Sequence, residues 1–272
     1  MSKIVILFAT GAVALYFWAA FRLGSRLLKG APATQESKRL PIALGMGAAT
    51  FHALVLTSTV STPHGLNFSF FNAVSLLSWL VATLTLMVAM RKPVENLAIA
   101  ILPLAGMSVL SQIIFPKHEY IPDDLTVGLN LHILISVLAF GVLNIAAIQA
   151  ALLAIQNKQL RNRHPGGFVR GLPPLETMER LLFQIIAWGF ALQTLSLASG
   201  FAFLKDMFAQ HMVHKTVLAI TAWSVYAILL FGRWRFGWRG KVAIRWTIGG
   251  FVALVLAYVG SKLVLELVLG KQ

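Results

Sequence analysis

The chain has 272 residues, of which 58% are hydrophobic and only 12% are charged, and its mean hydropathy is +0.78. This composition excludes an ordinary soluble domain. The absence of cysteine excludes disulfides, CxxC redox chemistry and attachment of a cofactor through thioethers. The net charge of +14 comes from basic residues that lie between apolar segments, so it indicates a membrane topology and argues against nucleic acid as a partner.

Apolar segments follow one another with short breaks along the whole chain. They predict an all-α fold, in which one integral membrane domain (residues 1–272) forms a polytopic bundle of about eight transmembrane helices. The first segment, Ile4–Phe21, lacks the basic start and small-residue cleavage site of a signal peptide, so we expect it in the mature protein. The other spans are expected at Leu40–Val60, Leu66–Met90, Leu97–Phe115, Leu125–Gln156, Leu181–Leu204, Met207–Phe231 and Val242–Leu269.

Lysine and arginine are distributed unequally between the alternate loops that these spans define. One set of loops holds 17 of the 23 basic residues and the other holds 6. Because loops rich in these residues stay in the cytoplasm, the bias predicts that both termini lie outside, on the periplasmic side of a bacterial inner membrane. The inner loop Asn157–Arg180 also contains Pro and Gly, and its charge suits contact with anionic lipid headgroups.

The long uncharged span Leu125–Gln156 carries a histidine near its start. His132 lies on one helical stripe with five mostly small residues, Ser136, Ala139, Leu143, Ala146 and Ala150. Such a stripe lets a neighbouring helix approach closely, or it leaves room for a flat ligand. The residues alone leave both possibilities open.

Six of the seven histidines fall in the outer half of the predicted membrane region or on its outer surface, and His164 is expected in the inner loop. His52 and His132 lie inside spans, where ionisable side chains usually face the bundle interior and have a partner. Either both are neutral and hydrogen bonded between helices, or their neutral imidazoles ligate a metal or a haem iron. The remaining histidines line the predicted outer mouth: His64, His118, His211 and His214.

The residues offer little for a discrete divalent metal or for catalysis. Glu266, near the end of the last span, is the only carboxylate inside any span, so the outer histidines lack hard oxygen ligands. The pair His211 and His214 can share one helix face, although an interfacial pair of this spacing is more often simply hydrated. No hydrolase elbow, phosphate loop or HExxH motif occurs, so we recognise no bond-breaking site, and enzymatic activity stays open.

Three segments occur in a fixed order: FSFFNAVSLLSW (Phe68–Trp79), LNLHILISVLAFGVL (Leu129–Leu143) and HKTVLAITAWSVYAILLFGR (His214–Arg233), which GWRGKVA (Gly237–Ala243) follows. Together they resemble the cytochrome c assembly family, membrane haem-handling proteins that include the CcsA and CcmC branches. The first is similar to the family's SNLYESLxFLSW stretch, with Asn72 in place of the usual Glu. The resemblance covers residues 66–272 and is close to the YpjD-type inner-membrane branch, including its LETMER segment.

The resemblance implies haem handling, with His132 at the position of the family's first outward haem-ligating histidine. The chain also departs from the family pattern. FAQHMVHK, which ends at Lys215, lacks the tryptophan-rich motif that presents haem to an acceptor; Phe231 stands where the family has a histidine; and the last outer histidine has no counterpart. A second iron ligand is therefore expected from His52, His211 or His214.

The residues and the resemblance together predict a multi-pass inner-membrane protein that binds or passes haem b near its periplasmic leaflet. His132 is expected as one axial ligand, and aromatic side chains are expected to line the porphyrin, namely Phe70, Phe71 and Trp79. Expected partners are the lipid bilayer and a haem acceptor or other membrane assembly proteins. Two alternatives stay open: a non-redox accessory or regulator of divalent-metal or tetrapyrrole homeostasis, and a structural partner of a membrane complex.

Overall fold

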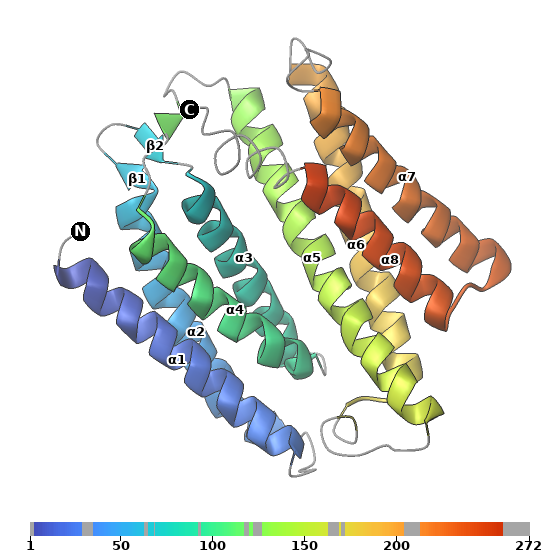
Figure 1. Cartoon of the computed structure of the whole chain (residues 1–272), viewed down its shortest axis with the longest axis horizontal. Coiled ribbons are helices and arrows are strands. Elements are labelled where there is room, and N and C mark those ends of the chain that lie inside the picture. Colours follow the sequence, from blue (N-terminus) through green and yellow to red (C-terminus); the bar gives the residue numbers. More distant parts are fainter. Residues whose placement is uncertain are drawn as a thin grey trace. The chain divides into compact units, whose positions relative to one another are not determined.

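The computed structural model describes residues 3–28, 35–62, 65–67, 69–91, 94–116, 120–121, 127–162, 169, 172–203 and 213–257. Within these residues the protein consists of eight helices and three very short strands, which confirms the all-α prediction. The described residues form two compact units (Figure 1). The N-terminal unit is residues 1–124 with 162–173, and the C-terminal unit is residues 125–161 with 174–272. The expectation of one integral domain stays a prediction.

The N-terminal unit contains four helices, and small residues let them pack closely. Their bounds are α1 Lys3–Leu28, α2 Gln35–Thr59, α3 Phe70–Arg91 and α4 Glu95–Ile114. Helix α1 packs on α2 and α4, and α3 packs on the same two helices. Ala12 and Ala19 of α1 are fully buried, and a Cβ added at Gly45 of α2 would come within 2.8 Å of Leu86. These contacts put the helix backbones close together, as in other membrane bundles.

A small antiparallel sheet joins two links of the N-terminal unit. Strand β1 (Ser61–Thr62) follows α2, β2 (Gly65–Asn67) precedes α3, and β3 (Tyr120–Ile121) follows α4. Leu66 pairs with Ser61 on one side and with Ile121 on the other. The sheet thus connects the end of the α2–α3 hairpin to the segment that follows α4.

The C-terminal unit also contains four helices: α5 Val127–Arg161, α6 Leu175–Phe203, α7 Val213–Phe236 and α8 Gly240–Val255. Helix α5 packs against α6 and α8, while α7 packs against α6 and α8. Glycine again permits close approach, because a Cβ added at Gly189 of α6 would come within 2.5 Å of Leu143 of α5. At the other side of the unit, Gly250 of α8 faces Tyr226 of α7.

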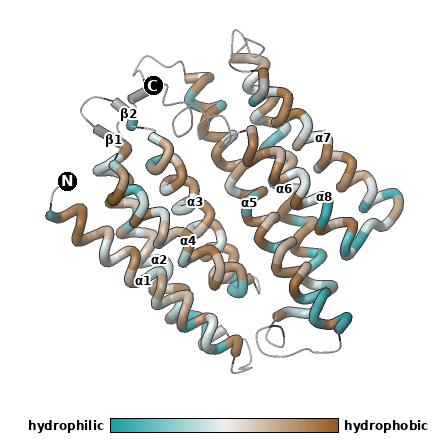
Figure 2. Tube along the Cα trace, in the orientation of Figure 1, coloured by the Kyte–Doolittle hydropathy of each residue, from teal (hydrophilic) through white to brown (hydrophobic). Residues whose placement is uncertain are grey.

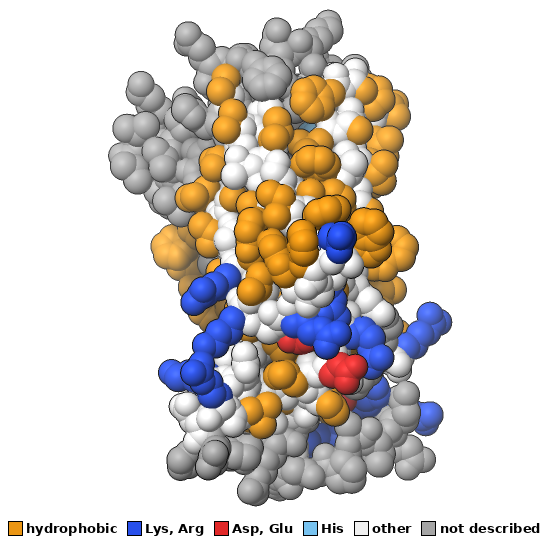
Figure 3. Space-filling model, turned by 90° about the vertical axis from the view of Figure 1, so that its right-hand side faces the viewer, with side chains coloured by type: hydrophobic (Ala, Val, Ile, Leu, Met, Phe, Trp, Pro, Cys, Tyr) orange, Lys and Arg blue, Asp and Glu red, His pale blue; other side chains and the backbone are white. Residues whose placement is uncertain are grey.

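Apolar residues cover most of the length of these helices (Figure 2), and many large apolar side chains point outward, such as Phe21 and Trp188, which are 71% and 72% exposed. Seven helices, α1 to α7, are long and apolar enough to cross a membrane. Helix α8 is described over 16 residues, and the predicted span Val242–Leu269 continues outside the described residues. The predicted orientation of the termini stays a prediction. Figure 3 shows the Lys and Arg side chains gathered below a broad hydrophobic area on the face that it draws.

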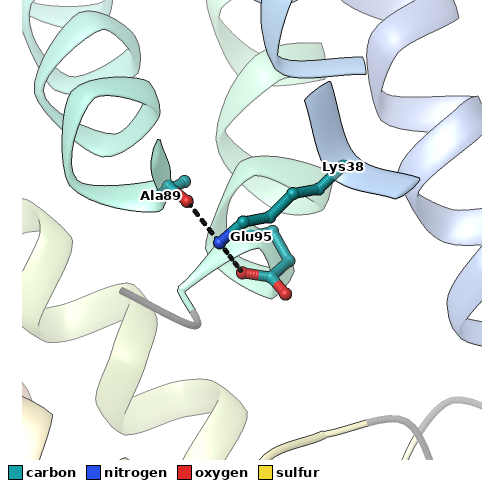
Figure 4. A network of polar contacts seen from close by, with 3 residues as sticks. All are labelled: Lys38, Ala89 and Glu95. Atoms are coloured by element: carbon teal, nitrogen blue, oxygen red, sulfur yellow. Dashed lines mark hydrogen bonds and ion pairs between the residues drawn. The ribbon is translucent and has the colours of Figure 1, made fainter. Parts of the chain in front are cut away.

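One basic side chain ties three helices of the N-terminal unit together (Figure 4). The Nζ atom of Lys38, near the start of α2, donates a hydrogen bond of 2.8 Å to the carbonyl oxygen of Ala89 in the last turn of α3. It also lies 3.9 Å from Oε2 of Glu95, in the first turn of α4. Lys38 therefore satisfies a carbonyl that the end of α3 leaves open, and it balances a carboxylate at a helix N-terminus.

Candidate functional site

His52 of α2 lies at the centre of the N-terminal unit and is completely buried. Its Nδ1 atom lies 3.3 Å from the hydroxyl of Tyr16 on α1, and its Nε2 atom lies 2.9 Å from the hydroxyl of Ser75 on α3. Both ring nitrogens thus have hydrogen-bond partners from neighbouring helices. This is the arrangement that a buried neutral imidazole needs.

The partners of Ser75 determine which nitrogen of His52 carries the proton. The Ser75 hydroxyl donates to Oε1 of Gln112 on α4, at 2.6 Å. A hydroxyl has only one proton to donate, so Ser75 accepts its other hydrogen bond from the Nε2–H group of His52. The Nδ1 lone pair of His52 then accepts from Tyr16. In this neutral tautomer His52 has no lone pair left for a metal ion.

The same chain of hydrogen bonds continues from Gln112 to the short sheet. The amide nitrogen of Gln112 donates to Oγ1 of Thr59 at 2.6 Å and to Oδ1 of Asn72 at 3.0 Å. The amide nitrogen of Asn72 donates in turn to the carbonyl oxygens of Thr59 and Asn67, at 3.3 and 3.1 Å. Hydrogen bonds therefore run from α1, through α2, α3 and α4, to strand β2. We call these residues the His52 network: Tyr16, His52, Thr59, Asn67, Asn72, Ser75 and Gln112.

His132 has a different environment in the C-terminal unit. It lies five residues after the start of α5, about 8 Å along the helix axis, and is partly buried. Its Nδ1 atom lies 3.0 Å from the carbonyl oxygen of Ser196 and 3.0 Å from the hydroxyl of Ser199, both on α6. A carbonyl can only accept, so Nδ1 carries the proton. The Nε2 lone pair has no hydrogen-bond partner among the residues that the structure describes.

This arrangement of His132 is the one that ligating histidines adopt. A histidine that binds a metal commonly donates its other ring N–H to a backbone carbonyl, which fixes the tautomer and the orientation of the ring. The hydroxyl of Ser199 also donates to the Ser196 carbonyl, at 2.9 Å. His132 is therefore hydrogen bonded at Nδ1, and its Nε2 has no partner among the described residues. In His52, by contrast, both ring nitrogens have hydrogen-bond partners.

Helix α6 covers the small-residue stripe that follows His132. The hydroxyls of Ser136 and Ser196 lie 2.7 Å apart, and Leu143 faces Gly189. All five stripe residues are buried: Ser136, Ala139, Leu143, Ala146 and Ala150. Of the two possibilities that the stripe suggested, close approach of a neighbouring helix is thus the one observed.

The predicted aromatic residues lie on α3, in the N-terminal unit. Phe70 and Phe71 make an edge contact, and Phe71 stacks on Phe115 with ring centroids 5.1 Å apart. The indole nitrogen of Trp79 donates to the carbonyl oxygen of Ala49 at 2.8 Å. Trp79 also lines an open apolar recess of about 270 Å³ between α2 and α3, with Ala53, Leu56, Thr57, Val60 and Leu76.

The predicted site residues are divided between the two units. His52, Phe70, Phe71 and Trp79 belong to the N-terminal unit, and His132 belongs to the C-terminal unit. His211 lies outside the described residues, as does the side chain of His214, whose backbone belongs to the first turn of α7. In the part of the chain that the structure describes, no group of three or more His, Cys, Asp or Glu side chains could hold a metal ion.

Sequence patterns alone do not identify the polar residues that hold the two histidines. Tyr16, Ser75 and Gln112 hold His52, while Ser196 and Ser199 hold His132. One available signal was the presence of Asn72 and Gln112 inside otherwise apolar spans, because a polar side chain in hydrocarbon needs a partner. The serines gave no such signal, since a serine hydroxyl commonly bonds to a carbonyl of its own helix.

A bundle of this kind, with apolar outer surfaces and a hydrogen-bonded histidine inside each unit, defines a polytopic helical membrane protein. A family model described as Cytochrome C assembly protein matches residues 41–269, so the chain belongs to this family. This result confirms the resemblance seen in the sequence.

Several curated proteins are similar to this chain. The inner membrane protein YpjD of Escherichia coli strain K12 is 34% identical over 237 residues, which cover 85% of this chain and 88% of that protein. Protein HemX of Brevibacillus brevis is 22% identical over 47% of this chain and 48% of its own length. The cytochrome c biogenesis protein CcsA of Prochlorococcus marinus strain NATL1A is 29% identical over 40% of this chain and 34% of its own length. No solved structure matches the chain. The protein is thus a multi-pass inner-membrane protein of the cytochrome c assembly family.

Proposed function

We propose that the protein binds haem b, with His132 as one axial ligand of the iron, near the predicted periplasmic end of α5. The observation that carries this proposal is the anchored Nδ1 atom of His132, which lies 3.0 Å from the carbonyl oxygen of Ser196 and leaves the Nε2 lone pair open. A neutral imidazole with a free nitrogen is the form that ligates haem iron. Membership of the cytochrome c assembly family supports the same function.

The second axial ligand is proposed to be His214 or His211 in preference to His52. Ligation by His52 would require it to give up the hydrogen bond to Tyr16 or the one to Ser75. Because His52 is completely buried, leaving Tyr16 or Ser75 without this hydrogen bond would cost free energy. His214 belongs to the first turn of α7, and His211 precedes this helix in the chain. Helix α7 belongs to the same unit as His132.

The residues of this chain would hold and orient the haem without breaking a bond. When bound, haem would supply an iron that can accept and release one electron, and two histidine ligands would favour carriage or electron transfer over oxygen chemistry. Ser196 and Ser199 would keep the His132 ring in one orientation.

An absorption spectrum tests this proposal. Protein purified gently from haem-replete cells is expected to show a Soret band, and the pyridine haemochrome spectrum identifies the porphyrin type. His132→Ala is expected to lose most of the band, while His164→Ala is the matched control, because the sequence predicts His164 in the inner loop. A colourless wild-type protein, or equal bands in the two variants, would contradict ligation by His132.

One observation favours a second function, that of a structural partner in a membrane complex. The His52 network satisfies the imidazole of His52 within the N-terminal unit, as a structural histidine requires. This function predicts that a double variant, His52→Leu with His132→Leu, lowers the level of folded protein but leaves growth independent of haem and metal supply. Haem-dependent growth in the His132→Leu single variant would favour the first function.

A further inference from the structure

The turn between α7 and α8 combines exposed cations with a fixed backbone. Its exposed basic side chains are Arg235, Arg239, Lys241 and Arg245, which we call the basic turn. Gly237 and Gly240 have φ angles of +66° and +53°, which residues with a Cβ rarely adopt. The amide of Gly240 donates to Oε1 of Glu179 on α6, at 2.8 Å. Glycine conformation and a buried carboxylate therefore hold the turn in one shape.

A row of aromatic rings supports the basic turn. Phe231, Phe236, Trp238 and Trp246 follow one another with ring centroids 6.2, 6.3 and 5.5 Å apart. Trp238 packs directly over Gly232. The row begins near the end of α7, crosses the turn and ends on α8, so the cations project from a packed surface and not from a loop that adopts many conformations.

Arg235 of the basic turn lies 5.8 Å from the centre of the Phe236 ring, and Arg233 is held more closely. Its guanidinium lies 4.7 Å from the centre of the Phe183 ring on α6, and its Nη1 atom donates to the carbonyl oxygen of Trp238 at 3.2 Å. Arg233 is therefore part of the support. Lys241 and Arg245 are four residues apart on α8, so their side chains lie on one helix face.

The positive charge of the basic turn is not balanced within the described part of the C-terminal unit. No ion pair joins any of its four side chains to a described acidic residue. Glu179 is buried with one oxygen on Gly240, and Glu176 is exposed in the first turn of α6. Four cations that repel one another favour an anionic partner.

The neighbouring apolar side chains indicate what this partner is. Trp234 is 81% exposed and Phe236 is 65% exposed, beside Arg235 in the chain. Exposed tryptophan next to basic residues is typical of the level at which lipid headgroups meet hydrocarbon. Figure 3 shows basic side chains gathered below a hydrophobic area, which is the pattern that a headgroup layer would meet.

We propose that the basic turn is a binding site for the phosphate headgroup of an anionic phospholipid. The cations of the turn bind the phosphate, and Trp234 and Phe236 lie against the first carbons of the acyl chains. Each Lys or Arg side chain close to an anionic lipid surface increases the affinity of the protein for that lipid about fivefold. The turn therefore selects anionic over zwitterionic lipid by its charge and its fixed shape.

Native mass spectrometry of the full chain in detergent tests this site. The protein is titrated with dioleoylphosphatidylglycerol and, separately, with dioleoylphosphatidylcholine, which has the same acyl chains but no net charge. We expect the wild-type protein to bind the anionic lipid more tightly. The double variant Arg239→Gln, Lys241→Gln is expected to lose about 25-fold in affinity for the anionic lipid and little for phosphatidylcholine.

The matched control is Lys158→Gln, Arg161→Gln, which removes two exposed charges from the last turn of α5. It is expected to keep the wild-type selectivity, because no aromatic row supports those residues in the described structure. A second pair, Arg235→Gln with Arg245→Gln, repeats the test if the first pair folds poorly. Equal affinity of the wild-type protein for both lipids, or the same loss in the control as in the turn variants, would overturn the proposal.

Discussion

The Nε2 atom of His52 lies 2.9 Å from the hydroxyl of Ser75, and this contact joins α2 to α3 inside the N-terminal unit. Ser75 is fully buried and passes the hydrogen bond on to Gln112. One hydroxyl thus satisfies a donor on one helix and an acceptor on another. Loss of this hydroxyl leaves two buried polar groups without a partner, so Ser75 is a sensitive position of the His52 network.

We expect Ser75→Ala to destabilise the protein. Each buried polar group left unsatisfied costs about 1–3 kcal/mol, and the variant leaves both His52 and Gln112 in this condition. The unfolding temperature in detergent measures the effect. Ser58→Ala is the control, because its hydroxyl is exposed and bonds only to the Leu54 carbonyl of its own helix. Equal unfolding temperatures for the two variants would show that the network contributes no stability.

A second prediction concerns Ser199 and depends on haem binding by His132. Ser199→Ala removes one of the two groups that contact Nδ1 of His132 but keeps the Ser196 carbonyl. Loss of a group that orients a ligating histidine costs roughly 10–100-fold in affinity for a metal, and we expect the lower end of this range because one acceptor remains. Haem titration followed by absorbance measures the affinity. Thr221→Ala is the control, because this threonine is exposed on α7 and its hydroxyl bonds to the Val217 carbonyl of its own helix.

Much of the fold could be predicted from the sequence, because hydropathy reports directly on what the membrane requires of a helix. The predicted span Leu125–Gln156 corresponds to α5, which the structure extends to Arg161, beyond the apolar segment. The predicted span Leu40–Val60 agrees with the span Lys38–Thr59 of the structure, while helix α2 itself begins earlier, at Gln35, with polar residues. Helix ends outside hydrocarbon leave no hydropathy signal, so their bounds were less accurate than the spans themselves.

The candidate site could be predicted only in part. The presence of histidines inside spans was visible in the sequence, and so was the stripe that His132 shares with Ser136. The difference between the two histidines was not visible, because it depends on Ser75 for one and on Ser196 for the other, residues 23 and 64 positions away. Hydrogen-bond partners between helices are set by packing, which periodicity along one helix does not report.

Lys38 provides a third prediction. Lys38→Met would leave the carboxylate of Glu95 mostly buried without its cation and the Ala89 carbonyl without its donor. Removal of one partner of a buried ion pair costs about 3–5 kcal/mol, and we expect roughly 2–3 kcal/mol because the 3.9 Å separation is long and Glu95 is 16% exposed. The double variant Lys38→Met, Glu95→Gln is expected to regain most of this stability. Thermal unfolding of the two variants measures the difference, and no recovery would contradict the charge argument.

The contact between Gly232 and Trp238 leads to the last prediction. A Cβ at Gly232 would overlap ring atoms of Trp238, whereas a Cβ at Gly249 of α8 would meet no atom within 4 Å. Trp238 cannot move away freely, because its ring also packs on Phe236 and Trp246. Gly232→Ala is therefore expected to destabilise the α7–α8 turn by about 1–3 kcal/mol, as overpacking does.

Gly249→Ala makes the same chemical change in open space, and there we expect stability to hold or to rise slightly, because alanine favours helix more than glycine does. Hydrogen exchange of the amides from Gly237 to Lys241 reports directly on the turn. Faster exchange in Gly232→Ala alone would support the packing argument. The same exchange rates in both variants would mean that the aromatic row does not hold the turn, and the fixed shape assigned to the basic turn would then lose its physical basis.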